Sequence, residues 1–349
     1  MRKAPVIFFH TGKKPFLFCF FAYLALIAAI SALCLNMPAA KRIFFDEEFM
    51  RGAFPIVCGV SPYGAFPLAA EKHADNTPRE ASSGQKNYKK EKEPGLSLQK
   101  TSTRISPPSS GVSLNNASGL NISRADYTKS AAFSLKDCSV LIIHTHATES
   151  YTPSKAYPYT PTDTDRTTDN NFNMVRVGDE VEKVLKENGI NVYHDTSQND
   201  YPSYNKSYQK SCTAAQSYIK KDPSIKIILD IHRDAAQDKN GNKIACVSEI
   251  EGKRAASVML VVGSNASGLE HDLWRGNLSF AYALQAHTSA LYPGLFRPIN
   301  LRSQRFNQHL APAAVIVEIG TNGNTLDEAL LGARLFSEGL CSFINQSAS

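Results

Sequence analysis

The chain has 349 residues, and its 38 Lys and Arg against 32 Asp and Glu leave a net charge of only +6. The basic residues are not concentrated in a stretch with interleaved aromatics, which argues against a nucleic-acid-binding protein. The seven cysteines are scattered and form no Cys-x-x-Cys pair, which argues against zinc held by thiolates and against a dense disulfide framework.

Residues 16–36 form an uncharged apolar run that is long enough to cross the hydrocarbon core of a membrane as a helix. Basic residues in the segment 1–15 precede it, so the positive-inside rule favours a cytoplasmic N-terminus with the rest of the chain outside. A cleaved signal peptide is the alternative, but the apolar run is long for one, and Met37-Pro38-Ala39 is a poor cleavage site. We therefore predict a single-pass protein of the cell membrane.

Two segments of different composition follow the expected anchor. Residues 37–70 are moderately apolar and are interrupted by prolines, which predicts a juxtamembrane segment. Residues 71–136 are rich in Lys, Ser, Asn, Pro and Gly and have few apolar side chains. Such a composition buries too little surface to offset the entropy of ordering, so we expect a flexible, disordered linker.

Residues 137–349 have the pattern of a folded catalytic domain in which strands and helices alternate. This alternation predicts an α/β fold with a mostly parallel sheet and helices on both faces. Short apolar, β-branched runs predict strands at 140–143, 190–193, 225–231, 257–262 and 315–319. Periodic apolar positions predict helices at 173–187, 204–221, 277–292 and 326–344.

Polar side chains able to bind a metal follow three of the predicted strands. His144, His146 and Glu149 come after the first of them, His232 after the third, and Glu318 after the last. Because the carboxyl ends of parallel strands meet at one edge of a sheet, these residues are expected to converge there.

Two imidazoles and one carboxylate with an open fourth position are typical of a catalytic zinc site. We predict that His146, Glu149 and His232 are the zinc ligands, and that Glu318 is the general base that takes a proton from water. Asp230, on the same side of its strand as His232, is expected to orient that ring. His144 is the alternative ligand; His146 is preferred because it lies past the strand end and nearer to Glu149.

Five motifs in this order resemble the stage II sporulation protein P family, over roughly residue 138 to the C-terminus. They are His144–Ser150 (HTHATES), Leu229–Asp234 (LDIHRD), Gly268–Leu278 (GLEHDLWRGNL), Asn307–His309 (NQH) and Val317–Asn324 (VEIGTNGN). The domain is also similar to the zinc-dependent N-acetylmuramoyl-L-alanine amidases.

The resemblance implies a membrane-anchored peptidoglycan hydrolase that acts during engulfment in sporulation. It implies cleavage of the N-acetylmuramoyl-L-alanine amide, and the family is also associated with cleavage within peptide cross-links. The implied partner is a lytic transglycosylase of the stage II sporulation protein D type, with other engulfment membrane proteins. In the amidases a Glu at the start of the first helix is the middle zinc ligand, whereas residues 169–173 here contain no Glu, so Glu149 is the substitute.

Two other classes of function fit the same residues. A metallocarboxypeptidase-like enzyme acting on wall peptides would use the pattern His146-Ala-Thr-Glu149 with a distant His. A non-catalytic scaffold that binds the cell wall would need neither zinc nor a general base. The products released from the wall distinguish these alternatives from an amidase.

Overall fold

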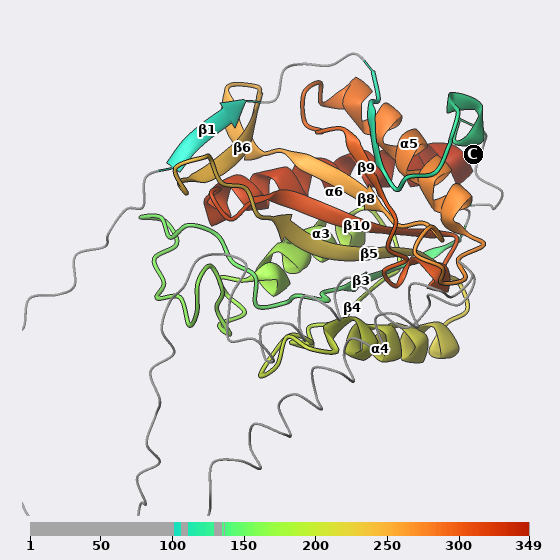
Figure 1. Ribbon diagram of the computed structural model, residues 1–349, viewed down its shortest axis with the longest axis horizontal. Coiled ribbons are helices and arrows are strands. Elements are labelled where there is room, and N and C mark those ends of the chain that lie inside the picture. The colour runs from blue at the N-terminus through green and yellow to red at the C-terminus, as the bar shows by residue number, and fades with distance from the viewer. Residues whose placement is uncertain (1–100, 106–110, 129–134, 136, 349) are drawn as a thin grey trace, which may run out of the picture. The chain divides into compact units, whose positions relative to one another are not determined.

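The computed structural model describes residues 101–105, 111–128, 135 and 137–348 (Figure 1). The expected N-terminus, anchor and juxtamembrane segment, residues 1–15, 16–36 and 37–70, lie outside the described residues. Within the described ranges, none of the helices is both long and apolar enough to cross a membrane. The predicted membrane anchor therefore stays a prediction.

A seven-stranded sheet forms the centre of the fold, with the strand order β2-β9-β8-β10-β5-β3-β4. Every neighbouring pair is parallel except β8 with β10, which is antiparallel. The strands are β2 (Leu114–Ala117), β3 (Ser139–Ile143), β4 (Val192–His194), β5 (Ile225–Asp234), β8 (Val258–Val262), β9 (Ile299–Arg302) and β10 (Ala313–Thr321). The predicted mostly parallel sheet of an α/β fold is confirmed.

Four α-helices pack against this sheet: α3 (Met174–Glu187), α4 (Ser207–Lys221), α5 (Trp274–Leu291) and α6 (Leu326–Ala348) (Figure 1). Val140 and Ile142 of β3 belong to the larger apolar core, which also contains side chains of α3, α5 and α6. Leu141 and Ile143 point the other way and pack in a smaller core with Ala215 of α4. The strand alternation thus gives the sheet one face covered by three helices, the α3 face, and one covered by α4, the α4 face.

The boundaries of α3 follow from its terminal residues. The Asn173 side chain caps the N-terminus by accepting a hydrogen bond of 2.9 Å from the backbone N–H of Val175. The helix ends at Asn188-Gly189, where Gly189 has φ +76°, a conformation that glycine adopts at little cost. The sequence predicted both ends of this helix.

A second sheet of three strands, in the order β1-β6-β7, was not predicted. Its strands are β1 (Thr101–Ile105), β6 (Lys243–Ile250) and β7 (Lys253–Ala256). The β6–β7 hairpin turns at Glu251 and Gly252, which both have positive φ, as tight hairpin turns require. Glu-Gly is not one of the dipeptides that usually mark such a turn, so the sequence offered no clear signal for it.

Two strands also lie within residues 71–136, the segment whose composition predicts a flexible linker. β1 pairs with β6, and β2 pairs with β9 at the edge of the large sheet. Both strands are short, and β2 is mostly exposed, so they have little apolar pattern of their own. Their order comes from pairing with strands far away in the sequence, which composition does not reveal.

Candidate active site

The predicted site residues of β5 and β10 lie side by side. His232 pairs in register with Glu318 across these two parallel strands, so both side chains point to the same face of the sheet. Ile228, four residues before His232 in β5, lies on the same face of the sheet and packs in the smaller core beneath α4. The site is therefore at the carboxyl edge of the sheet, on the α4 face.

His144 and His146 point in different directions. His144 follows the last residue of β3 and is fully buried; its Nδ1 lies 3.2 Å from the carbonyl oxygen of Ile231, and its Nε2 lies 2.8 Å from Nε2 of His194. Burial, with a smaller contribution from His194, lowers the pKa of His144 to about 3, so this ring is neutral near pH 7. Both ring nitrogens of His144 thus contact other residues on the α3 face of the sheet.

His146 lies in the turn after β3 and faces the site. Its ring stacks on Tyr204, with 4.4 Å between centroids, and its Nε2 is 3.0 Å from the Tyr204 hydroxyl. It also stands edge-on to the His232 ring at 5.3 Å between centroids. Burial lowers the pKa of His146 to about 4, so this imidazole is neutral near pH 7 and keeps a lone pair for a metal.

Asp230 holds the turn and the His232 ring together. Its carboxylate accepts hydrogen bonds from the backbone N–H of Thr145 at 2.8 Å and from the Thr145 hydroxyl at 2.6 Å. One of its oxygens also lies 2.8 Å from Nε2 of His232. Asp230 therefore has the position expected of a residue that orients this imidazole.

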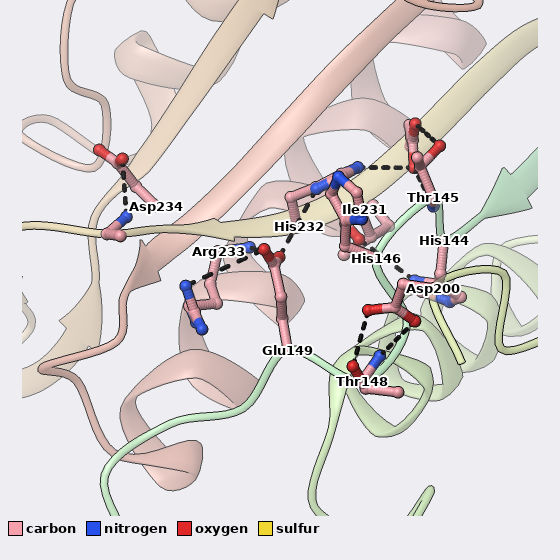
Figure 2. Close-up of polar contacts among 12 residues, drawn as sticks. His144, Thr145, His146, Thr148, Glu149, Asp200, Ile231, His232, Arg233 and Asp234 are labelled. Carbon is pink, nitrogen blue, oxygen red and sulfur yellow. Dashed lines mark hydrogen bonds and ion pairs between the residues drawn. The ribbon is translucent and has the colours of Figure 1, made fainter. Parts of the chain in front are cut away.

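The other nitrogen of His232 faces Glu149, which reaches up from the turn after β3 (Figure 2). The distance from Nδ1 of His232 to Oε2 of Glu149 is 3.6 Å. Burial alone would disfavour a charged ring, but Asp230 and Glu149 outweigh it and raise the pKa of His232 well above its usual range. Burial likewise opposes ionisation of Glu149, yet Arg233 and His232 hold the pKa of this carboxyl well below its usual range.

Glu318 has a different environment from Glu149. The residue is partly buried, and its Oε2 is a buried oxygen with no hydrogen-bond partner among the described residues. The pKa of Glu318 is raised to about 8, chiefly by burial; His232 opposes this rise, and Asp234 and Glu149 contribute to it. Two carboxyls with pKa values pushed apart are typical of sites where one binds a cation and the other exchanges protons.

The donor set of His146, Glu149 and His232 fits a zinc ion in its chemistry. Nδ1 of His146 is buried without a hydrogen-bond partner in the described part of the chain, so it is available as a ligand. The 3.6 Å between Nδ1 of His232 and Oε2 of Glu149 is close to the roughly 3.4 Å expected between two ligands of a tetrahedral zinc ion.

The three donors do not, however, all approach one another as closely as a bound ion requires. Among the described residues, the one set of three His, Cys, Asp or Glu donors that lie within 4.8 Å of one another is Asp179, Glu182 and His194. The structure brings His232 and Glu149 into contact and places the His146 ring beside His232. The donor atoms of the three residues do not all lie within 4.8 Å of one another.

Several residues of the site were not predicted. Arg166 lies 2.5 Å from Asp200 and 3.5 Å from Glu149, and its guanidinium lies over the Tyr204 ring. Tyr208 packs edge-on against His146 at 5.6 Å between ring centroids. The four-residue spacing of Tyr204 and Tyr208 at the start of a predicted helix was a signal for a shared face, but not for contact with His146.

Arg233 lies next to Glu149 and connects the site to neighbouring backbone. It is buried, and it donates hydrogen bonds to the backbone carbonyl oxygens of Ser150 at 3.0 Å and Asp165 at 2.9 Å. These bonds connect β5 to the segment that follows the turn. Together with its charge beside Glu149, they make Arg233 a structural cation and leave it little freedom to bind a substrate carboxylate.

The fold and site define an α/β protein with a histidine and carboxylate cluster at one edge of a mostly parallel sheet. Residues 61–341 match the family model of Stage II sporulation protein P (SpoIIP). The chain belongs to this family, as the sequence motifs predicted.

A curated relative in the family is stage II sporulation protein P of Bacillus subtilis (strain 168), which is 29% identical over 216 residues. The match covers 57% of this chain and 50% of that protein, so the chain spans about half the length of this relative.

Solved structures that align with the chain include two bacterial amidases. The N-acetylmuramyl-L-alanine amidase Ami1 from Mycobacterium smegmatis is 14% identical, with 62% of this chain and 99% of that chain covered and a TM-score of 0.38. The N-acetylmuramoyl-L-alanine amidase from Clostridium difficile 630 is 16% identical, with 60% and 97% covered and a TM-score of 0.35.

Proposed function

We propose that this protein is a peptidoglycan hydrolase of sporulation that cleaves the N-acetylmuramoyl-L-alanine amide with zinc-activated water. Membership of the stage II sporulation protein P family supports the role in sporulation. The observation that carries the chemistry is the arrangement around His232. One of its nitrogens faces Asp230, the other faces Glu149, and Glu318 stands beside it on the neighbouring strand.

Zinc would be held by His146, Glu149 and His232, the donors gathered on the α4 face. When bound, zinc supplies a Lewis acid that lowers the pKa of a water ligand and polarises the carbonyl of the amide. Asp230 fixes the His232 ring by facing its Nε2, which leaves Nδ1 directed toward Glu149. Tyr204 does the same for His146, because it engages Nε2 and leaves Nδ1 unpartnered.

Glu318 is the proposed proton carrier. Its Oε2 is buried and makes no hydrogen bond within the described chain, so no competing partner holds this oxygen. A pKa of about 8 in the metal-free site is close enough to neutrality for the carboxyl to gain and lose a proton readily. Glu318 would take a proton from the attacking water and return it to the leaving nitrogen of the amide.

The proposed setting follows from family membership and from the expected anchor. A chain anchored in the mother-cell membrane at the sporulation septum, with its domain on the extracytoplasmic side, would meet the peptidoglycan there. A lytic transglycosylase of the stage II sporulation protein D type and other engulfment membrane proteins are the proposed partners. Cleavage within peptide cross-links is the second bond that the same residues could serve.

Digestion of purified sacculi by the full-length chain tests the proposal. We expect the wild type to release glycan strands from intact stem peptides, and the Glu318→Gln variant to lose this activity while keeping its zinc. Glu249→Gln, which neutralises an exposed carboxylate on β6, is the matched control and should remain active.

The products decide between the candidate functions. Muramyl glycan and intact stem peptide identify the amidase. Release of single terminal amino acids would identify a carboxypeptidase instead. Sacculi that are bound but not solubilised, with the wild type and Glu318→Gln behaving alike, would identify a scaffold and overturn the proposal.

A further inference from the structure

A second cluster of possible metal ligands lies on the α3 face of the sheet. Asp179 and Glu182 are three residues apart on α3, so both side chains project from one side of the helix. His194, at the end of β4, points between them, and its side chain is only 2% exposed. The three donor atoms lie within 4.8 Å of one another.

The hydrogen bonds of the two neighbouring histidines determine which nitrogen of His194 carries a proton. The carbonyl oxygen of Ile231 can only accept, so Nδ1 of His144 donates to it. With its proton on Nδ1, His144 accepts at Nε2, so Nε2 of His194 is the donor in the 2.8 Å bond between the rings. In the tautomer of His194 that donates from Nε2, Nδ1 has a lone pair.

That lone pair faces two carboxylates instead of a donor. Nδ1 of His194 lies 3.4 Å from Oδ1 of Asp179 and 3.4 Å from Oε2 of Glu182. Three electron-rich atoms that face one another need a cation between them. The other oxygen of Glu182 is already paired with Lys186 at 2.6 Å, so this lysine does not occupy the space between the three donors.

The distances favour a metal ion over a proton as that cation. A protonated Nδ1 would form a charge-assisted hydrogen bond of about 2.7–2.9 Å with one of the carboxylates. Both contacts are instead 3.4 Å, so the hydrogen bond between Nδ1 and Oε2 of Glu182 is long, and both separations match the roughly 3.4 Å between ligands that share a tetrahedral zinc ion.

Gly178 leaves space for the paired rings. A Cβ at this helical position would come within 2.5 Å of Nε2 of His194 and 2.6 Å of Nε2 of His144. Glycine inside a helix is less favourable than alanine, and here its absent side chain lets the two imidazoles approach α3.

We propose that Asp179, Glu182 and His194 bind a divalent transition-metal ion of the zinc class. The site is separate from the proposed active site, because its side chains lie on the α3 face while His232 and Glu318 lie on the α4 face. Imidazole and carboxylate are ligands that zinc accepts, and the exposed side of Asp179 leaves room for water to complete the coordination. The ion would fix α3 to the end of β4.

Titration of the full-length chain with Zn²⁺ alone tests the proposal. In a His232→Ala background, which disables the proposed active site, we expect one equivalent of Zn²⁺ to bind by calorimetry. Adding Asp179→Asn should weaken this binding at least tenfold. Glu187→Gln removes the same charge from α3 at an exposed residue outside the cluster, and should bind Zn²⁺ as the background does.

A second measurement on the wild type identifies the ligand atom. In nitrogen NMR spectra of the histidine-labelled chain, Nδ1 of His194 should change from an unprotonated to a metal-bound resonance when Zn²⁺ is added. Equal Zn²⁺ affinity for Asp179→Asn and Glu187→Gln would overturn the proposal. So would a His194 ring that keeps a proton on both nitrogens in the presence of Zn²⁺.

Discussion

Replacing Glu318 with Gln is expected to stabilise the metal-free protein while it removes activity. The pKa of Glu318 is about 8 in the fold against an ordinary value of 4.5, chiefly because the carboxyl is buried. Between these values the unfolded chain releases its proton and the folded chain keeps it. The stability of the wild type therefore falls as the pH rises from about 4.5 to 8. Gln cannot ionise, so the variant escapes this loss.

The size of the effect follows from the separation of the two pKa values. At pH 7 the difference from 4.5 spans about 2.5 units, which at about 1.36 kcal/mol per unit amounts to about 3 kcal/mol. This figure is an upper bound, because Glu318 keeps part of its surface exposed. At pH 5 the same reasoning gives less than about 1 kcal/mol.

Chemical denaturation of the chelator-treated, full-length chain measures both quantities. We expect the free energy of unfolding of Glu318→Gln to exceed that of the wild type by about 1–3 kcal/mol at pH 7, with the gain nearly absent at pH 5. Glu249→Gln should show no such pH dependence. A gain of equal size at both pH values, or none at either, would refute the assignment of a raised pKa to Glu318.

Three further outcomes are expected. In an Asp179→Asn background, His232→Ala should strongly reduce the zinc retained after dialysis, because it removes one of three ligands of the proposed active site; elemental analysis showing full retention would reject the ligand assignment. Zinc binding at that site should strengthen as the pH rises, because the metal must displace a proton from His232, whose pKa is raised by Asp230 and Glu149. Calorimetry in buffers of different ionisation enthalpy should detect this proton, and an affinity independent of pH would contradict it. Gly178→Ala should destabilise the fold by about 1–3 kcal/mol in urea denaturation, because its Cβ would collide with the paired rings of His144 and His194; an unchanged midpoint would show that the rings can move aside.

Much of the large sheet could be predicted from local pattern. The apolar runs 140–143, 225–231 and 315–319 became β3, β5 and β10, and the helical periods became α3 to α6 with small changes at their ends. The three strands are largely buried and the helices bury one side, so their sequences carry the alternation or periodicity that burial imposes. Strands β1, β2 and β9 are short, β2 and β9 are in part exposed, and the order of all three depends on partners elsewhere in the chain.

The location of the site could be predicted from the sequence, but the pairing of its residues across neighbouring strands could not. The rule that parallel strands end at one edge was enough to expect His232 and Glu318 near each other. Their placement opposite one another depends on the register of β5 with β10, which packing decides and local sequence does not reveal. The contact of His146 with Tyr204 could not be predicted either, because it depends on the position of the loop residues just before α4, which include Tyr204.

The short turn after β3 has a consequence for how sequences of this kind are compared. Residues two apart in a continuing strand share a face, so an extended chain would send His144 and His146 in the same direction. They diverge because Thr145 is tied to Asp230 through both its amide and its hydroxyl. Thr145 thus determines the directions of the two imidazoles through its bonds to Asp230, and a comparison restricted to histidines and acids would overlook it.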